Sequence, residues 1–141
     1  MLTIRQCWDE LVRQTVKTRK FQSVKALPLH RIADADFLKR FPGLKMPACL
    51  IVFLGRTGTA RGAALDRACR WSAVIVDTDA GGDAWEKVVD LVDDFEDGVL
   101  DEQYLDDALT VHASSEVGVA DSNPRFAIYE VSFTTREAAE R

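Results

Sequence analysis

The chain has 141 residues, a net charge of −5 and a hydrophobic fraction of 47%. This size and composition predict one globular domain over residues 1–141 and argue against a globally disordered chain. The longest apolar run, residues 48–54, is far shorter than a membrane-spanning helix requires, so we expect a cytoplasmic protein without a membrane partner.

The charges are distributed unevenly along the chain. Residues 1–76 contain 14 Lys and Arg against 5 Asp and Glu, whereas residues 77–107 contain 1 against 13. Opposite charges on two surfaces of one protein favour head-to-tail contacts between copies, although ordinary solvated faces would have the same composition. The negative net charge argues against nucleic acid as a partner.

Two amphipathic helices are predicted. The first spans residues 3–19, where Thr3 and Gln6 have the spacing of a capping box. The second begins at Asp83 and ends at Gly98, a natural helix stop. The apolar stripes of the two helices are Ile4, Trp8, Leu11, Val12 and Val16 in the first, and Trp85, Val88, Val89, Val92 and Phe95 in the second.

Five stretches have the composition of strands: residues 21–33, 48–54, 68–77, 109–113 and 127–133. Pro28 predicts that the first is an edge strand, and the continuous apolar run of the second predicts a central strand covered on both faces. We expect a Gly/Arg/Thr loop over residues 55–66, which would join the second and third strands into a long hairpin.

The order of these elements predicts the α+β fold class, with a mainly antiparallel sheet of four to five strands and two main helices packed on it. Residues 34–47, which contain two proline breaks, predict a short helical turn or a packed loop. Residues 136–141 are polar and are expected to be a frayed tail of the single domain.

Motifs for cofactors, metals and catalysis fail on spacing. Residues 55–62 resemble a phosphate loop but lack its second Gly and its Lys, and residues 77–88 lack the final Glu of a calcium loop. Ser115 and Asp121 follow His112, but no nucleophile-elbow motif accompanies them. We therefore expect no enzyme, no catalytic residue, no cofactor and no metal. The widely spaced cysteines predict buried free thiols: Cys7, Cys49 and Cys69.

Clustered charges are the remaining candidates for function. Guanidinium groups pair well with carboxylates, so arginines on the predicted hairpin loop would suit an acidic partner surface. The aspartates of the second helix lie on its wet face with nothing apolar to enclose them, which favours a solvated or partner-facing surface over acid–base or metal chemistry. The candidate protein interface comprises Arg56, Arg61, Arg67, Arg70, Asp90, Asp93, Asp94 and Asp97.

The order of elements also carries a resemblance to a known family. An amphipathic helix precedes an apolar strand introduced by Met46-Pro47, then come a second strand, a helix beginning near Asp83 and an alternating last strand, residues 126–133. Over roughly residues 3–135 the chain resembles the tail terminator (tail completion) proteins of long-tailed phages and prophages, including the minor tail protein U type. Residues 21–47 and the strongly acidic helix depart from that pattern.

This resemblance implies a non-enzymatic structural protein, commonly a hexamer, whose ring caps the tail tube and joins it to the head. The implied partners are further copies of the chain, the tail tube protein and head–tail connector proteins. The implied location is the bacterial cytoplasm during assembly and then the virion tail. Two other classes remain open: a small-molecule-binding or regulatory α+β domain, and a small enzyme of unrecognised type.

Overall fold

The computed structural model of the chain describes residues 2–28, 44–61, 64–78, 84–123 and 126–137. Within these ranges lie two helices, α1 (Ile4–Lys17) and α2 (Ala84–Val99). They also contain six strands: β1 (Ser23–Pro28), β2 (Ala48–Arg61), β3 (Ala64–Thr78), β4 (Gln103–Tyr104), β5 (Leu109–Asn123) and β6 (Phe126–Glu137). The turn or loop predicted for residues 34–47 falls largely outside the described residues.

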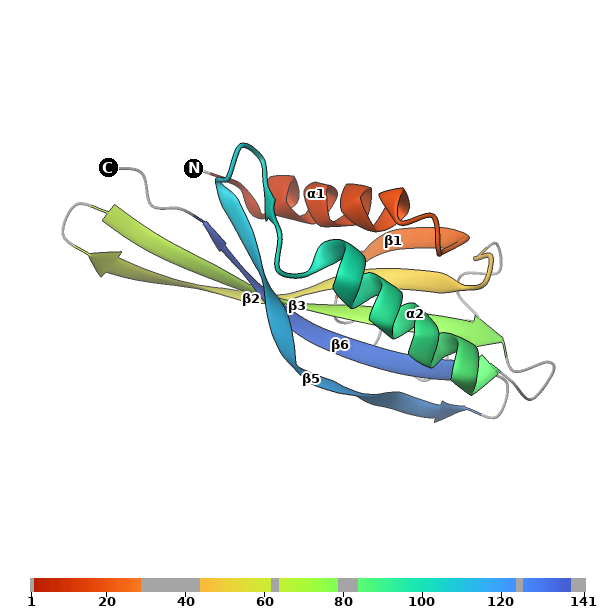
Figure 1. Cartoon of the computed structure of the whole chain (residues 1–141). Coiled ribbons are helices and arrows are strands. Elements are labelled where there is room, and N and C mark those ends of the chain that lie inside the picture. Colours follow the sequence, from red (N-terminus) through yellow and green to blue (C-terminus); the bar gives the residue numbers. More distant parts are fainter. Residues whose placement is uncertain (1, 29–43, 62–63, 79–83, 124–125, 138–141) are drawn as a thin grey trace.

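All six strands belong to one curled sheet in the order β1-β2-β3-β6-β5-β4 (Figure 1). β1 runs parallel to β2, and every other pair of neighbours is antiparallel. β1 therefore lies at one edge, as Pro28 predicted. Both helices pack on the same face of the sheet, where their apolar side chains join those of β2, β3, β5 and β6 in one core.

The predicted fold class was wrong in its proportions. The molecule is mostly sheet, with six strands in the described residues rather than four to five, and the helices are a minor part of it. The prediction ended each strand where apolar alternation ended, but backbone pairing continues further. β2, β3 and β5 are 14 or 15 residues long, and strands of that length twist and curl the sheet they form.

The largest single difference concerns the predicted loop over residues 55–66. Most of it is strand, because β2 continues to Arg61 and β3 starts at Ala64. After a register shift between Phe53 and Gly55, the two strands pair down to Arg61 and Ala64. We call residues 55–61 and 64–70 the arm. Residues 67–70 still pair with β6 on their other side, so in the described residues only the outer part, residues 59–61 and 64–66, is two-stranded. Figure 1 shows its tip running out beyond both helices.

The sheet is buried on both faces near its centre. Residues 48–52 of β2 are at most 1% exposed, which confirms the prediction of a central strand. Cys49 and Ile51 point into the main core beneath the helices, whereas Leu50 and Val52 join a second, smaller core on the opposite face. The three cysteines are buried and free, as predicted.

The amino-terminal cap of α1 is also confirmed. The Thr3 hydroxyl accepts a hydrogen bond from the Gln6 amide at 3.0 Å, and the Gln6 side chain accepts one from the Thr3 amide at 2.8 Å.

One member of each predicted apolar stripe stays outside the core. Val16 on α1 is 55% exposed and Val89 on α2 is 45% exposed.

Gly98 does not end α2, which continues to Val99. A Cβ atom at residue 98 would lie 2.9 Å from the Thr18 methyl group, closer than real carbon atoms approach. The glycine therefore permits α2 to pass close to the carboxyl end of α1. The predicted start of this helix, Asp83, lies outside the described residues.

Candidate protein-interaction surfaces

The four candidate arginines do not form one patch. Arg56 and Arg67 lie on the helix-covered face of the arm and border the same surface hollow, of about 440 Å³, beside the first turn of α1. Arg70 lies on the opposite face, where its guanidinium group passes over Gly55. Arg61 is the last residue of β2 and pairs with Ala64 at the tip of the arm.

The candidate aspartates are likewise divided between two sides of α2. Asp94 and Asp97 face the carboxyl end of α1, whereas Asp93 borders a different hollow next to β5 and β6. Asp90 is exposed on the same helix. The sequence periodicity predicted one solvent-exposed face of the helix for all four side chains. In the folded chain α1 lies on one side of that face and the strands on the other, so the aspartates border different hollows.

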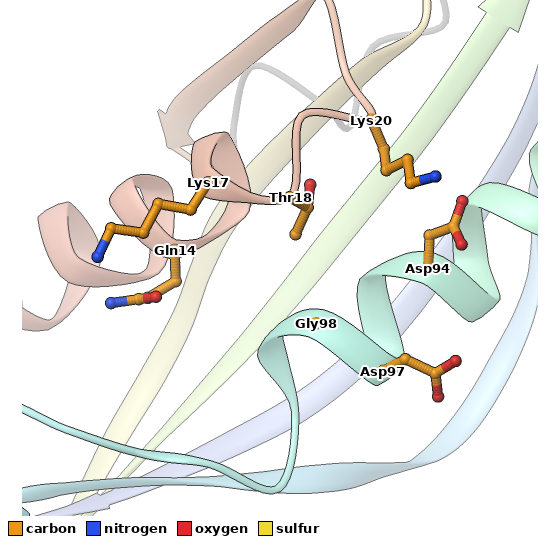
Figure 2. A pocket seen from close by; sticks show the side chains of 7 residues that line it. All are labelled: Gln14, Lys17, Thr18, Lys20, Asp94, Asp97 and Gly98. Carbon is orange, nitrogen blue, oxygen red and sulfur yellow. The ribbon is translucent and has the colours of Figure 1, made fainter.

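An open cleft of about 380 Å³ separates α1 from α2 (Figure 2). Lys17 and Lys20 line it from the side of α1, and Asp94 and Asp97 line it from the side of α2. The cations belong at the carboxyl end of a helix, where they complement its dipole. The cleft thus has cations on one border and carboxylates on the other, and in Figure 2 the Lys17 side chain points away from both aspartates.

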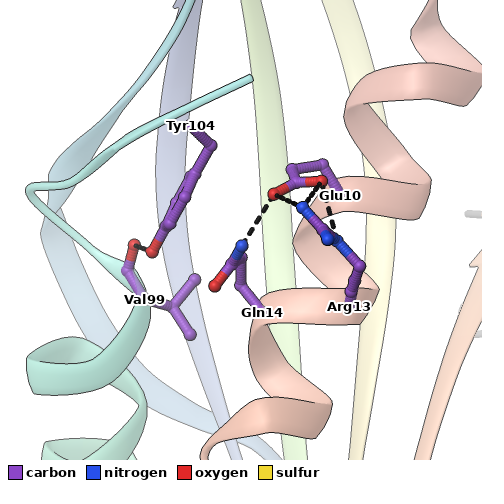
Figure 3. A network of polar contacts seen from close by, with 5 residues as sticks. All are labelled: Glu10, Arg13, Gln14, Val99 and Tyr104. Atoms are coloured by element: carbon purple, nitrogen blue, oxygen red, sulfur yellow. Dashed lines mark hydrogen bonds and ion pairs between the residues drawn. The ribbon is translucent and has the colours of Figure 1, made fainter. Parts of the chain in front are cut away.

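A partly buried set of polar contacts lies beside this cleft (Figure 3). Glu10 is only 5% exposed and accepts hydrogen bonds from Arg13 and Gln14 at 2.7 Å, while the Tyr104 hydroxyl donates to the Val99 carbonyl at 3.0 Å. Burial raises the pKa of Glu10, but the bonds from Arg13 and Gln14 outweigh it and the net pKa is lowered. Burial and the nearby Glu102 and Glu10 charges raise the pKa of Tyr104 to about 12. The bonds of Glu10 stay within α1, and the bond of Tyr104 ties the segment that follows α2 to the last residue of that helix, so each set of bonds fixes its own element.

The second hollow, which we call the α2 groove, lies between α2 and the strands β5 and β6. Its volume is about 280 Å³, and its lining is mainly apolar with carboxylates at the border: Val89, Val92, Asp93, Glu96, Val117 and Tyr129. Tyr129 is held by Trp85, with ring centroids 5.6 Å apart in an edge-to-face arrangement. Partial burial raises the pKa of Glu96, and the charges of Asp93, Asp97 and Asp101 add to this effect.

The sequence did not reveal the α2 groove. Val89 belongs to a helical stripe that looked wholly buried, and Val117 lies on a distant strand. The pairing of β5 with β6 sets Val117 opposite Val131, on the face of the sheet that α2 covers. Val117 and Val89 therefore reach the same surface.

His112 is exposed and borders an open cleft with Asp101, Glu102 and Asp107, while His30 lies outside the described residues. Among the residues that the structure describes, no three His, Cys, Asp or Glu side chains come together as metal ligands. In the same residues, no helix has the length and apolar character needed to cross a membrane.

Comparisons with known proteins add no relative: no family model matches the chain, and no curated protein matches it.

Proposed function

We propose that this protein is a non-enzymatic structural subunit that associates with further copies of itself into a ring, and that the ring caps a phage or prophage tail tube and joins it to the head. The proposal places the protein in the host cytoplasm during assembly and afterwards in the virion tail. Its further partners are then the tail tube protein and head–tail connector proteins, and it needs no cofactor.

The arm is the observation that carries this proposal. Its tip runs out beyond both helices, and its described side chains include exposed Arg56, Thr57 and Arg70. Among the described residues, β1 pairs with β2 only up to Phe53, so the outer edge of β2 in the arm has no strand beside it. A projecting, basic, open-edged ribbon is a suitable contact element for a second protein chain.

The charge distribution supports the same reading. The arm and the segment around the carboxyl end of α1, residues 13–20, are rich in cations, while α2 is rich in carboxylates, so one copy offers two unlike surfaces. Contacts between unlike surfaces are heterologous, and they form a ring when the rotation between neighbouring copies closes.

Sedimentation velocity of the purified full chain over a range of concentrations tests the proposal directly. We expect a discrete oligomer of wild-type chain, with ring-shaped particles in negative-stain electron micrographs. The charge reversals Arg61→Glu and Arg67→Glu together should weaken the oligomer and make it more sensitive to salt. A matched control reverses two exposed lysines away from the arm, Lys25 and Lys45. A wild-type chain that stays monomeric at every concentration would contradict the proposal.

A further inference from the structure

Three large apolar side chains in the described residues are strongly exposed: Val16 at 55%, Val89 at 45% and Val117 at 44%. Val89 and Val117 are neighbours in the α2 groove, and Val16 lies alone on α1. Exposed apolar side chains that gather on one surface mark contact sites more often than isolated ones do. The question is therefore what covers the groove.

The surroundings of the groove specify the charge of its occupant. Asp93 and Glu96 border it, and Asp97 and Asp101 add to the negative field at Glu96. An apolar side chain surrounded by cations would fill the valine floor and also neutralise this border.

The end of α1 has this composition. Val16 lies in the last turn of the helix, and Arg19, which follows the cap residue Thr18, has a positive φ of 58° that turns the chain away. The residues next to Val16 in the sequence include four exposed cations: Arg13, which pairs with Glu10, Lys17 and Lys20, which border the cleft of Figure 2, and Arg19. We call Val16 and these four residues the α1 patch.

The α1 patch and the α2 groove of one copy are kept apart. The cleft of Figure 2, lined by Lys17 and Asp94, lies between the two helices, and the groove is on the side of α2 that faces β5 and β6. The two surfaces are thus complementary in charge and in apolar content but meet only between separate copies.

We propose that the α1 patch of one copy docks into the α2 groove of the next copy. This inference rests on the proposed function, because it names a second contact between neighbouring copies, beside that of the arm, and holds that association needs both. Val16 then covers Val89 and Val117, and the cations of the patch lie over Asp93 and Glu96. The contact is heterologous, so each copy keeps one free patch and one free groove for its two neighbours.

Two single substitutions isolate the two sides of this contact. Val16→Glu places a negative charge on the patch and leaves the groove intact, whereas Val117→Arg fills the groove and leaves the patch intact. Because both valines are exposed, we expect both variants to fold, which circular dichroism and thermal melting will verify. Each variant alone should be monomeric in sedimentation velocity at concentrations where the wild type is oligomeric.

An equimolar mixture of the two variants is the decisive measurement. The intact patch of the Val117→Arg chain should dock into the intact groove of the Val16→Glu chain, giving a one-to-one dimer that grows no further. The controls Gln103→Glu and Gln103→Arg introduce the same charges at an exposed residue outside both surfaces and should leave the wild-type oligomer unchanged.

The outcomes separate this inference from the proposed function. If the wild type assembles and either variant assembles equally well, or if the mixture stays monomeric, the patch-to-groove contact is overturned while self-association stands. If the wild type itself is monomeric, the proposed function fails and the contact fails with it.

Discussion

The indole Nε1 of Trp71 donates a hydrogen bond of 2.9 Å to the hydroxyl of Thr135, and the two side chains are 0% and 1% exposed. The bond joins β3 to β6 inside the main core, where Trp71 also packs edge-to-face on Phe53 and Trp8. A buried indole needs a partner for its N–H group, and the Thr135 hydroxyl supplies it.

Replacing Thr135 by valine keeps the shape of the side chain but leaves the indole N–H group without its partner. We expect the free energy of unfolding to fall by about 1–3 kcal/mol, the usual penalty for a buried donor left unsatisfied. Urea denaturation measures the change. Thr134→Val, on the opposite face of the same strand, is the control and should have a much smaller effect.

Gly98→Ala should destabilise the protein although alanine is the better helix former by about 1 kcal/mol. The new methyl group would meet the Thr18 methyl group at 2.9 Å and push α2 away from α1. Thr18→Ser removes that methyl group and keeps the hydroxyl that donates to the Thr15 carbonyl. A double-mutant cycle measured by thermal unfolding tests this reason. The double variant Gly98→Ala/Thr18→Ser should be more stable than the single variant Gly98→Ala. If the stability changes of Gly98→Ala and Thr18→Ser simply add, the close approach of residues 98 and 18 does not limit stability.

Thr3→Ala removes the side-chain half of the capping box on α1. We expect a loss of about 0.5–2 kcal/mol of stability, the usual range for a lost helix cap. Thr3→Ser preserves the hydroxyl that accepts from the Gln6 amide and should remain close to wild type. Guanidinium denaturation of the three proteins provides the comparison.

The lowered pKa of Glu10 predicts a pH dependence of stability. A carboxylate whose pKa is lower in the folded state stabilises the fold above its unfolded pKa and loses that contribution as the pH falls through the folded value. Glu10→Gln removes this contribution. The variant should be less stable than wild type near neutral pH, and the difference should shrink as the pH is lowered below the ordinary glutamate pKa of about 4.3. Melting temperatures across this pH range test the expectation, with the exposed Glu102→Gln as the control. An unchanged difference at low pH would exclude the carboxylate charge as the cause.

Both helices and the central strand could be predicted from the sequence because burial imposes a period on them. Leu11 and Phe95 are wholly buried, and residues 48–52 are apolar without interruption because both faces of β2 are covered. The arm could not be predicted in this way. Its residues are largely glycine, threonine and arginine. Cys69 enters the main core, but the outer residues 59–61 and 64–66 form strands through backbone pairing with each other.

The candidate surfaces were foreseeable only as sets of charges. Which arginines share a face depends on the register shift after Phe53, which sets Arg56 opposite Cys69 and Gly55 opposite Arg70. The sequence pattern also did not indicate that Val16 and Val89 are exposed. Each lies within a helical stripe wider than the surface that buries it, and the stripe alone does not show which member is left out.

The two halves of β2 have different neighbours, and this gives one continuous strand two rates of local opening. Residues 48–53 are paired with both β1 and β3, so we expect their amides to be the better protected from exchange. In the described residues, the half in the arm has β3 alone beside it, so its amides exchange with deuterium through smaller and more frequent fluctuations. Docking of another chain along that half would slow deuterium exchange of its amides. Exchange rates in the arm would therefore show whether the protein has assembled.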